Sequence, residues 1–332
     1  MRYLVNTSKD PYFNMALDEF VLEKMDLPAP VFFLWQNSPS VIIGMNQNAY
    51  AEVNIPYLEE NGINLVRRVT GGGAVYHDLE NLNYTIVGRS RDLEKDYPGY
   101  LNFMVNALRT LGVPAELSGR NDILVDGRKC SGYAKRVYKD RLMVHGTLMF
   151  DVDLEKLSKA LAVPGSKLSA AGISSVRSRV ANLKEFLPDV KDIQEFQRRL
   201  QAIMSRSSDG TIDEEVPLTP EDLAEVEKAA DSKFRTWEWI YGRSPKAEFL
   251  TKKKFKCGTV EVSYSINHGI ITSIRFGGDY LGNLPVDELE KRIEGVRDIP
   301  SELLKTLENG NPAGDYFDGM TNEELVSLIA GE

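Results

Sequence analysis

Cysteine and histidine are scarce in this chain of 332 residues, which contains two of the first and three of the second. Cys130 and Cys257 stand far apart and outside any CxxC pattern, so neither a disulfide framework nor a structural zinc site is indicated. Three histidines are too few for most histidine-based metal sites. The composition therefore predicts a protein of a reducing compartment, and we expect a cytoplasmic location.

Long apolar runs and an excess of positive charge are also missing. No run of about 18 apolar residues occurs, and the opening MRYLVNTSKDPYF lacks the charged, apolar and small-residue regions of a signal peptide. Lys and Arg number 40 against 49 Asp and Glu, which gives a net charge of −9. We therefore expect no membrane span, and the charge argues against nucleic-acid binding.

The remaining composition, with 42% hydrophobic and 27% charged residues, is typical of a globular protein that is long enough for two domains. Helical and strand-like periodicities alternate along the chain, which predicts the α+β class. The basic stretch GRSPKAEFLTKKK, residues 242–254, contains proline and precedes a new strand pattern. We therefore predict a catalytic domain over residues 1–245 and a small α+β domain over residues 246–332.

Local signals indicate where several helices and strands lie. Asp10 and Pro11 form an N-cap and first-turn pair before apolar residues at helical spacing. Asp126-Gly127 favours a tight hairpin turn between strands. Further strands are expected at 31–35, 41–43, 75–87, 142–150, 260–266 and 270–276, and further helices at 100–111, 192–205, 220–230, 286–293, 301–307 and 322–329.

The segment LVRRVTGGGAVYHDLENLNY, residues 65–84, places two arginines, three glycines and a His-Asp pair between hydrophobic runs. Gly71, Gly72 and Gly73 lack a Cβ, so the backbone can take positive φ and bring N–H groups close to an anion. Arg67 and Arg68 add planar donor forks. Neither Gly-Lys-Ser/Thr nor GxGxxG occurs here, which argues against P-loop and Rossmann nucleotide sites. The segment predicts another kind of anion-binding loop, and the alternative is a glycine-rich hairpin turn with surface arginines.

A second cluster, GRNDILVDGRKCSGYAKRVYKDRLMVHGTLMF, covers residues 119–150. Asn121 and Asp122 stand at a strand entrance, where their oxygens could contact a ligand or help hold a metal ion near phosphates. Lys139 lies in a Lys-Asp-Arg turn before the strand that carries His145. We predict that Lys139, protonated at neutral pH, stabilises a phosphate and a carboxylate under attack. The alternatives are a charged hairpin tip for Lys139 and a structural role for His145.

Together the two clusters resemble the lipoate-protein ligase family. RRVTGGGAVYHDLENLNY is similar to the family pattern RRxxGGGxVxHDxGNxNY, and SGRNDILVDGRKCSGYAKR is similar to SGRNDxxxxGxKxSGxA. DPYFNMALDE, residues 10–19, and KLSAAGISSVRSRVANL, residues 167–183, extend the likeness over residues 10–183. The small domain resembles the accessory C-terminal domain of longer bacterial ligases. The resemblance implies the mixed-sheet biotin/lipoate ligase fold.

That resemblance also implies a two-step reaction. The carboxylate of lipoate attacks the α-phosphate of ATP, which releases pyrophosphate and leaves lipoyl-AMP. The ε-amine of a lysine then attacks the mixed anhydride and expels AMP. The acceptor lysine belongs to an apo lipoyl domain of a 2-oxoacid dehydrogenase complex or to the glycine-cleavage H protein. Mg²⁺ is expected on the ATP phosphates, with Asp122 as a candidate ligand, and the protein is expected to act as a monomer.

Site residues follow from the same likeness, position by position. Lys139, which aligns with the family's invariant lysine ahead of the HGTLL strand, is the expected catalytic residue. The segment SSVRSRV, residues 174–180, is expected to form a lid over the adenylate, and the alternative is an ordinary surface loop. The expected ATP site comprises Arg68, Gly73, Ala74, Val75, Tyr76, Asn121, Asp122 and Lys139. The expected lipoate site comprises Leu17, Arg68, Val75, His77 and Lys139. The alternative for His77 and Asp78 is that they brace the glycine-rich loop.

Two departures from the family pattern leave other functions open. Glu80 replaces the glycine of HDxGN, and Cys130 takes a position that is usually Ile or Val. Octanoyl transferases of the same fold use a cysteine nucleophile and no ATP, so Cys130 raises that alternative. We interpret Cys130 instead as a buried replacement for an aliphatic side chain. A lipoyl-binding carrier without catalysis is the third hypothesis, and biotin ligase is disfavoured because GRGRxGR is absent.

Overall fold

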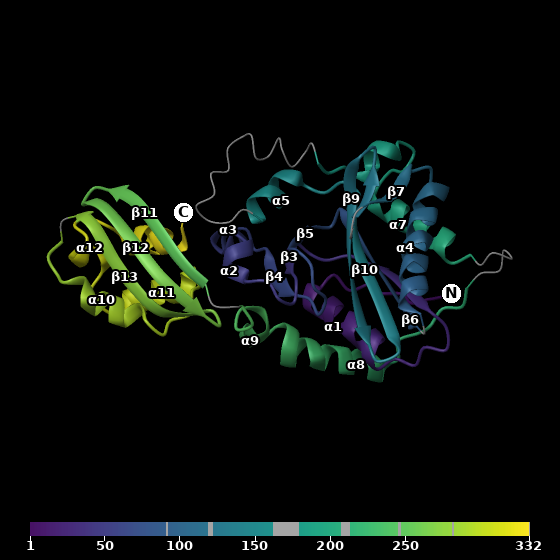
Figure 1. The fold of residues 1–332 in the computed structure, drawn as a ribbon, viewed down its shortest axis with the longest axis horizontal. Coiled ribbons are helices and arrows are strands. Elements are labelled where there is room, and N and C mark those ends of the chain that lie inside the picture. The colour runs from purple at the N-terminus through teal and green to yellow at the C-terminus, as the bar shows by residue number, and fades with distance from the viewer. Residues whose placement is uncertain are drawn as a thin grey trace. The chain divides into compact units, whose positions relative to one another are not determined.

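The chain forms two compact units (Figure 1). The computed structural model describes residues 1–90, 92–118, 122–161, 179–206, 213–244, 247–280 and 282–331. The first unit comprises Met1–Met45, Asn64–Ser158 and Leu168–Thr236, and the second comprises Asn46–Ile63, Lys159–Lys167 and Trp237–Glu332. The last segment of the second unit starts at Trp237, and the division into domains over residues 1–245 and 246–332 stays a prediction.

A seven-stranded mixed sheet forms the centre of the first unit. In spatial order its strands are β1 (Arg2–Tyr3), β2 (Val31–Trp35), β6 (Asn81–Arg89), β10 (Arg141–Met149), β9 (Arg128–Tyr138), β8 (Asp122–Val125) and β7 (Ala115–Ser118). Only β1 and β2 pair in parallel. All of β2 and all but the last residue of β6 are buried, which indicates that both faces of the sheet are covered. The prediction of an α+β fold with a mixed sheet is confirmed.

The two faces of this sheet differ in character. Leu82, Tyr84 and Ile86 of β6 face an apolar core beneath α4 (Leu93–Thr110) and α7 (Ile193–Met204). Because side chains alternate along a strand, Asn83 and Thr85 face the opposite side. Helix α1 (Pro11–Glu23) packs on that side, against β6 and β10. The polar face of the sheet is therefore the one that can hold a site.

A smaller sheet in the same unit carries the glycine-rich segment. Its order is β4 (Asn64–Arg67), β3 (Ser40–Ile43) and β5 (Val75–His77), with β3 parallel to β4 and antiparallel to β5. Helix α1 also packs against β4. The glycines connect β4 to β5, so the smaller sheet fixes both ends of that loop.

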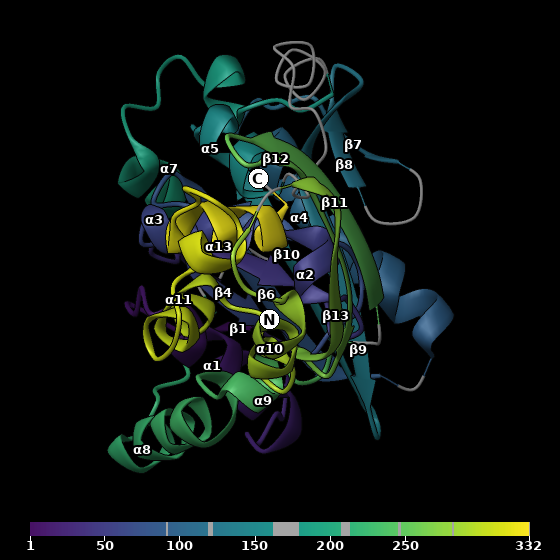
Figure 2. The same cartoon turned by 90° about the vertical axis from the view of Figure 1, so that its left-hand side faces the viewer.

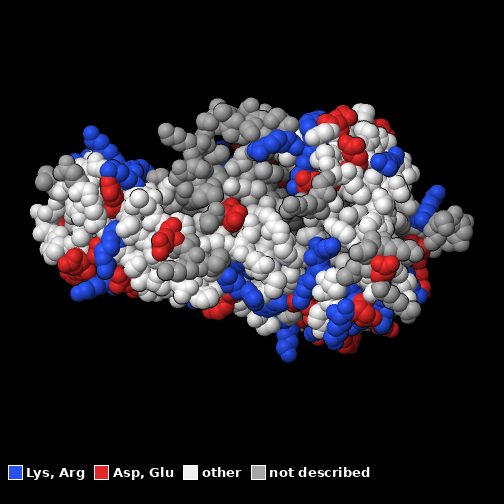
Figure 3. All heavy atoms as spheres, viewed as in Figure 1, with Lys and Arg blue, Asp and Glu red and all other residues white. Residues whose placement is uncertain are grey.

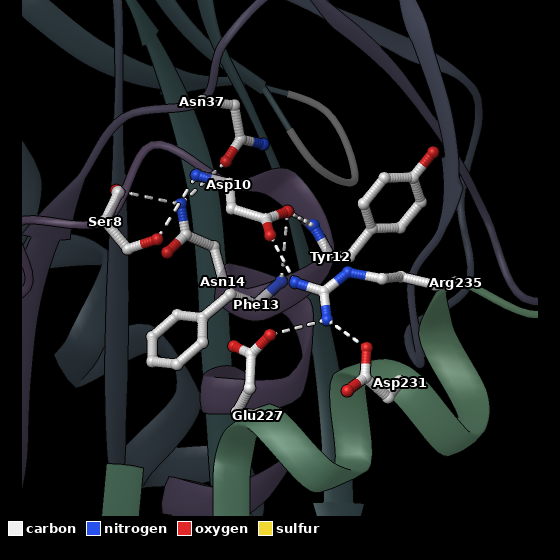
Figure 4. Close-up of polar contacts among 9 residues, drawn as sticks. All are labelled: Ser8, Asp10, Tyr12, Phe13, Asn14, Asn37, Glu227, Asp231 and Arg235. Carbon is white, nitrogen blue, oxygen red and sulfur yellow. Dashed lines mark hydrogen bonds and ion pairs between the residues drawn. The ribbon is translucent and has the colours of Figure 1, made fainter. Parts of the chain in front are cut away.

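The start of α1 is held by a polar cluster (Figure 4). The Asp10 carboxylate accepts from the backbone N–H of Tyr12 at 2.9 Å and so caps the helix, as the Asp-Pro pair predicted. Arg235 pairs with the same carboxylate and with Glu227 and Asp231. These last residues belong to the segment of α8 (Pro220–Ala229) and η2 (Ala230–Phe234) that packs on α1.

The second unit is built on a three-stranded antiparallel sheet of β11 (Ala247–Phe255), β12 (Gly258–Asn267) and β13 (Ile270–Tyr280). The β12–β13 turn has positive φ at His268 and Gly269, as a tight hairpin requires. Figure 2 shows its C-terminal helices gathered on one side of this sheet. The helices of the unit are α2 (Ala49–Glu52), α3 (Ile55–Glu60), α9 (Trp237–Ile240), α10 (Val286–Ile293), α11 (Pro300–Glu308), α12 (Ala313–Tyr316) and α13 (Asn322–Ala330).

Most predicted elements are present, with shifted ends. The Asp126-Gly127 turn joins β8 and β9 with positive φ at both residues. Helix α4 begins at Leu93, seven residues before the predicted start, and includes Pro98. The remaining short helices are α5 (Leu154–Ala160) and the 3-10 turn η1 (Leu183–Phe186). Within the described residues, no helix combines the length and the apolar character needed to cross a membrane.

Candidate active site

A cavity of about 160 Å³ opens on the polar face of the large sheet in the first unit. Met15, Trp35 and Ile42 contribute apolar surface, and Arg68, Lys129 and the two histidines contribute charge or hydrogen-bonding groups. Its walls are Met15, Trp35, Ile42, Arg68, Gly72, Gly73, Ala74, Val75, His77, Asn83, Lys129, Gly132, Tyr133, Ala134, His145, Gly146 and Thr147.

Arg68 organises the glycine-rich loop from a buried position. Its Nη2 donates to the carbonyl oxygens of Gly71 and Gly73 at 2.7 and 2.8 Å. In a trans peptide the carbonyl and the following N–H point in opposite directions, so the N–H groups of Gly72 and Ala74 point away from the guanidinium. Since Gly72 and Ala74 line the cavity, the loop can present two backbone donors there.

The charge of Arg68 is not balanced by a carboxylate among the described residues. Its other donors meet the Ile42 carbonyl at 3.0 Å and the Thr70 hydroxyl at 3.0 Å, which are neutral. Burial lowers the pKa of Arg68 to about 10, so the guanidinium still carries its charge at neutral pH. A buried cation that holds a loop of amide donors favours an anionic ligand.

Close packing explains which glycines the loop needs. A Cβ on Gly44 would lie 2.1 Å from the carbonyl oxygen of Gly72, so the loop approaches β3 through a position without a side chain. Gly72 has a φ of +96°, whereas Gly71 and Gly73 have no positive φ and open space around them. Of the three consecutive glycines, only Gly72 therefore uses the conformational freedom that the sequence suggested for all three.

Two lysines of the second cluster lie in different places. Lys129 lines the cavity, and its Nζ lies 2.8 Å from Asp122 Oδ1. Lys139 is exposed in the β9–β10 turn, with a φ of 53° and its Nζ 5.1 Å from the centroid of the Tyr138 ring. Tyr133, at the cavity, is five residues from the end of β9, which is roughly 17 Å of strand. The structure therefore does not bring Lys139 to the cavity, contrary to the sequence prediction.

An irregularity in the β8–β9 pairing accompanies Lys129. Ile123 pairs with Ser131 while Leu124 pairs with Lys129, so Cys130 is the extra residue of a bulge. Bulges next to sites re-aim side chains. The lysine of the family pattern GxKxSG is the signal that could have identified Lys129, because it matches GRKCSG.

His145 is hydrogen-bonded through both ring nitrogens. Its Nδ1 lies 2.7 Å from Asp18 Oδ2 and its Nε2 lies 2.7 Å from the Thr70 hydroxyl. Thr85 donates to the other Asp18 oxygen at 2.7 Å. Since Thr70 also accepts from Arg68, this chain of buried groups ties α1 to the glycine-rich loop.

The other predicted residues divide between the cavity and its surroundings. Gly73, Ala74, Val75 and His77 line the cavity, and their contacts with ATP and lipoate stay a prediction. Tyr76 is buried outside the lining, because alternate residues of β5 face opposite sides.

Other residues that the sequence assigned to the site are not among the lining residues of the cavity. The side chain of Leu17 on α1 is fully buried, and Met15 of the same helix lies in the cavity wall instead. Asn121 and most of the expected lid, residues 174–178, fall outside the described residues. Asp122 reaches the site through its ion pair with Lys129.

Cys130 belongs to the apolar core, as the sequence interpretation held. Its side chain is 0% exposed, and Sγ lies 3.4 Å from the Ile123 carbonyl oxygen. Burial raises the pKa of Cys130 to about 12, so the thiol is protonated at neutral pH. A cysteine nucleophile requires a thiolate, and this environment opposes one.

Within the described ranges, no three His, Cys, Asp or Glu side chains gather in a way that could hold a metal ion. Figure 3 shows Lys and Arg interspersed with Asp and Glu over the face drawn. That pattern lacks the continuous basic stripe of a nucleic-acid site.

The first unit thus combines mixed sheets with a glycine-rich loop beside a cavity that has apolar and charged walls. The family model described as lipoyl protein ligase A/B catalytic domain matches residues 10–205, and that of the bacterial lipoate protein ligase C-terminus matches residues 244–329. The chain belongs to the lipoate-protein ligase family.

Individual relatives and solved structures agree with this assignment. Lipoate-protein ligase LplJ of Bacillus subtilis is 39% identical over 321 residues, which cover 96% of this chain and 97% of that protein. A bipartite lipoate protein ligase of Thermoplasma acidophilum, from a lipoylation system with its E2 lipoyl domain, is 31% identical with a TM-score of 0.64, over 72% of this chain and 94% of that one. A lipoate-protein ligase A structure with bound ATP is 31% identical with a TM-score of 0.62, over 72% and 97%.

Proposed function

We propose that this chain joins lipoate to protein lysines in two steps, using ATP to form lipoyl-AMP first. The observation that carries the proposal is the buried guanidinium of Arg68, which has only neutral partners among the described residues and bonds the carbonyl oxygens of Gly71 and Gly73 beside a cavity with apolar and charged walls. Such a cavity suits a ligand with an anionic end and an apolar chain. The related ligase that binds ATP supports the choice of nucleotide.

In the first step, a carboxylate oxygen of lipoate attacks the α-phosphorus, a new O–P bond forms, and the bond to pyrophosphate breaks. The reaction needs positioning and neutralisation of charge more than a protein nucleophile. The loop donors of Gly72 and Ala74 and the guanidinium of Arg68 supply both on one side of the cavity.

We assign the role that the sequence predicted for Lys139 to Lys129. The ammonium of Lys129 lies in the cavity wall, 2.8 Å from Asp122 Oδ1. It can approach the α-phosphate and the acyl carbonyl oxygen, where negative charge develops in both steps. In the second step, the uncharged amine of the acceptor lysine attacks the acyl carbon and AMP leaves.

Mg²⁺ would reach this site with the phosphates of ATP. The cavity wall contains no carboxylate among its lining residues, and Asp122 is already paired with Lys129. A cation that prefers a few carboxylates and phosphate oxygens therefore fits here only as a companion of ATP, with Asp122 as its one candidate protein ligand. Its contribution would be to neutralise phosphate charge.

The proposed acceptor proteins are suggested by a related ligase. We infer that the chain lipoylates lysines of apo lipoyl domains, because the Thermoplasma acidophilum relative is paired with an E2 lipoyl domain. The glycine-cleavage H protein is a second proposed acceptor. Both cysteines are unpaired and buried, which supports a reducing cytoplasmic location, and we expect a monomer.

Lipoate-dependent exchange between ATP and labelled pyrophosphate tests the first step. The proposal predicts exchange with lipoate and, in a second assay, ATP-dependent transfer to an apo lipoyl domain. Acyl transfer from an octanoyl carrier protein without ATP would favour the transferase alternative. Folded protein that binds lipoate yet supports neither exchange nor transfer would favour the carrier alternative.

A further inference from the structure

Helix α1 presents two buried polar side chains to the cavity region, one turn apart. Asn14 is 1% exposed and Asp18 is 0% exposed, and residues four apart lie on the same face of a helix. Both belong to the DPYFNMALDE segment, whose polar residues the reaction steps above do not use. Asp18 bonds His145 directly, and Asn14 reaches His77 through Asn37.

The Asn14 amide has a fixed orientation. Its Nδ2 lies 2.9 Å from the Gln36 carbonyl oxygen and 3.2 Å from that of Ser8 (Figure 4). A carbonyl oxygen can only accept. Asn6 donates to the Oδ1 of Asn14 on the other side at 2.8 Å. The same Asn14 Nδ2 lies 2.8 Å from Asn37, so the atom of Asn37 that faces it is the accepting Oδ1.

This orientation decides the protonation of His77. With Oδ1 of Asn37 turned toward Asn14, the Nδ2 of Asn37 lies 3.0 Å from His77 Nδ1. An amide nitrogen only donates, so His77 Nδ1 accepts and the proton of the neutral ring is on Nε2. Burial, reinforced by the charge of Arg68, lowers the pKa of His77 to about 3 and keeps the ring neutral. His145 is the opposite case, because the Asp18 carboxylate draws the proton to Nδ1.

The Nε2–H of His77 is left without a partner among the described residues. The side chain is 3% exposed and lines the cavity beside Trp35, with 6.1 Å between the ring centroids. Because Nδ1 is held on Asn37, Nε2 is on the side of the ring away from that contact. A buried donor without a partner is rare in native structures and indicates a ligand or a water at that point.

We propose that Asn14 and Asn37 are positioning residues that hold His77 as a neutral Nε2–H donor, and that this donor bonds an acceptor atom of the acyl acid in the cavity. The inference rests on the proposed function, which places lipoate there. Lipoate has two kinds of acceptor, its carboxyl oxygens and the sulfurs of its ring. Octanoate has only the first kind, so the two acids distinguish them.

Nitrogen-15 NMR of the histidine side chains tests the tautomer in the intact protein. The chain has only three histidines, so the spectrum is simple to assign with single variants. We expect His77 as the Nε2–H tautomer at pH 7, without protonation down to pH 5, and His145 with a proton on Nδ1. A His77 ring with its proton on Nδ1, or one that becomes protonated between pH 7 and pH 5, would overturn the proposal.

Asn37→Asp replaces the donating amide by an accepting carboxylate of the same shape. We expect the proton of His77 to move to Nδ1, or a second proton to bind, and the KM for the acyl acid to rise 3- to 10-fold with little change in kcat. Asn54→Asp, which replaces one helix cap of α3 by another, is the matched control. An unchanged His77 tautomer in Asn37→Asp would contradict the positioning role.

His77→Phe removes the donor, and His77→Gln keeps an amide N–H near the same place. We expect the KM to rise 3- to 10-fold in His77→Phe and to recover in part in His77→Gln. A rise for lipoate alone identifies the ring sulfurs as the acceptor, and an equal rise for both acids identifies the carboxyl oxygens. Unchanged KM for both acids would refute the contact. Wild-type protein with the expected tautomer but no exchange would refute the proposed function instead.

Discussion

The two ends of strand β9 carry lysines with contrasting surroundings. Lys129, near the start, faces a cavity, pairs with Asp122 and lies at a bulge. Lys139, just past the end, is exposed in a tight turn. Ten residues of extended strand span roughly 33 Å, so the two ammonium groups cannot serve one site unless the strand folds back.

The comparison shows that a charge acquires chemical value from its environment. Water and salt screen the charge of an exposed ammonium. In a pocket wall the screening is weaker, so the electrostatic interaction of an ammonium with a bound ligand is stronger. Proximity in sequence to the HGT strand favoured Lys139, but the hairpin geometry places that residue at the tip. The site is defined by what faces the cavity.

The largest expected effect is the difference between these two lysines. Lys129→Ala removes a positioned donor and should lower kcat for lipoate-dependent exchange by about 10²- to 10³-fold. Lys139→Ala, the matched control, should leave kcat within about two-fold, as for most exposed sites. Equal losses in the two variants would break the comparison.

The next largest effect is expected from a comparison of two glycines at the glycine-rich loop, Gly44 and Gly71. A Cβ at Gly44 would collide with the Gly72 carbonyl oxygen at 2.1 Å, whereas one at Gly71 meets nothing within 4 Å. Gly44→Ala should displace the loop and reduce kcat/KM for ATP by about 10- to 100-fold. Gly71→Ala should have little effect. Similar kinetics for both variants would show that the loop does not depend on this close approach.

A third expectation concerns stability in acid. The pKa of His77 is about 3 in the folded protein, against about 6.5 in an unfolded chain. Below pH 6.5 the His77 ring binds a proton in the unfolded state but not in the folded state. The free energy of unfolding therefore falls as the pH decreases toward 3. One such group contributes a slope of up to about 1.4 kcal/mol per pH unit. His77→Phe should reduce that slope in urea titrations.

The control for that measurement is His268→Asn, at an exposed turn position where asparagine tolerates positive φ. It should leave the acid slope attributed to His77 in place. A slope that is the same in wild type and His77→Phe would contradict the neutral, buried state of His77.

The smallest expected effect is on activity in Cys130→Ala. The thiol is buried and protonated, so exchange and transfer should remain within about two-fold of wild type. Loss of a buried sulfur should cost about 1–2 kcal/mol of stability, measurable by chemical denaturation. Abolished transfer in a stably folded Cys130→Ala would instead support nucleophilic cysteine chemistry.

Local patterns in the sequence were sufficient for much of the fold. Asp10-Pro11 predicted the start of α1 and Asp126-Gly127 predicted a tight hairpin turn, because both dipeptides restrict the local backbone conformation. The glycine-rich loop was recognised because its composition reflects its backbone.

Contacts between distant segments could not be predicted in this way. The choice of Lys129 depends on a bulge opposite Ile123, and the state of His77 depends on a hydrogen-bond chain from Asn14 through Asn37. Such features depend on how strands pair and on which distant segments meet, and the periodicity of hydrophobic residues does not reveal either. Leu17 illustrates the same limit, since helical spacing marks it as apolar but not which neighbour it contacts.

The most direct test is a crystal structure with a stable analogue of lipoyl-AMP. The account predicts the phosphate within hydrogen-bonding distance of the Gly72 and Ala74 N–H groups, with Lys129 Nζ on a phosphate or acyl oxygen and Lys139 Nζ in solvent. An analogue bound away from the cavity of the first unit, or held through Lys139 with Lys129 turned away, would contradict it.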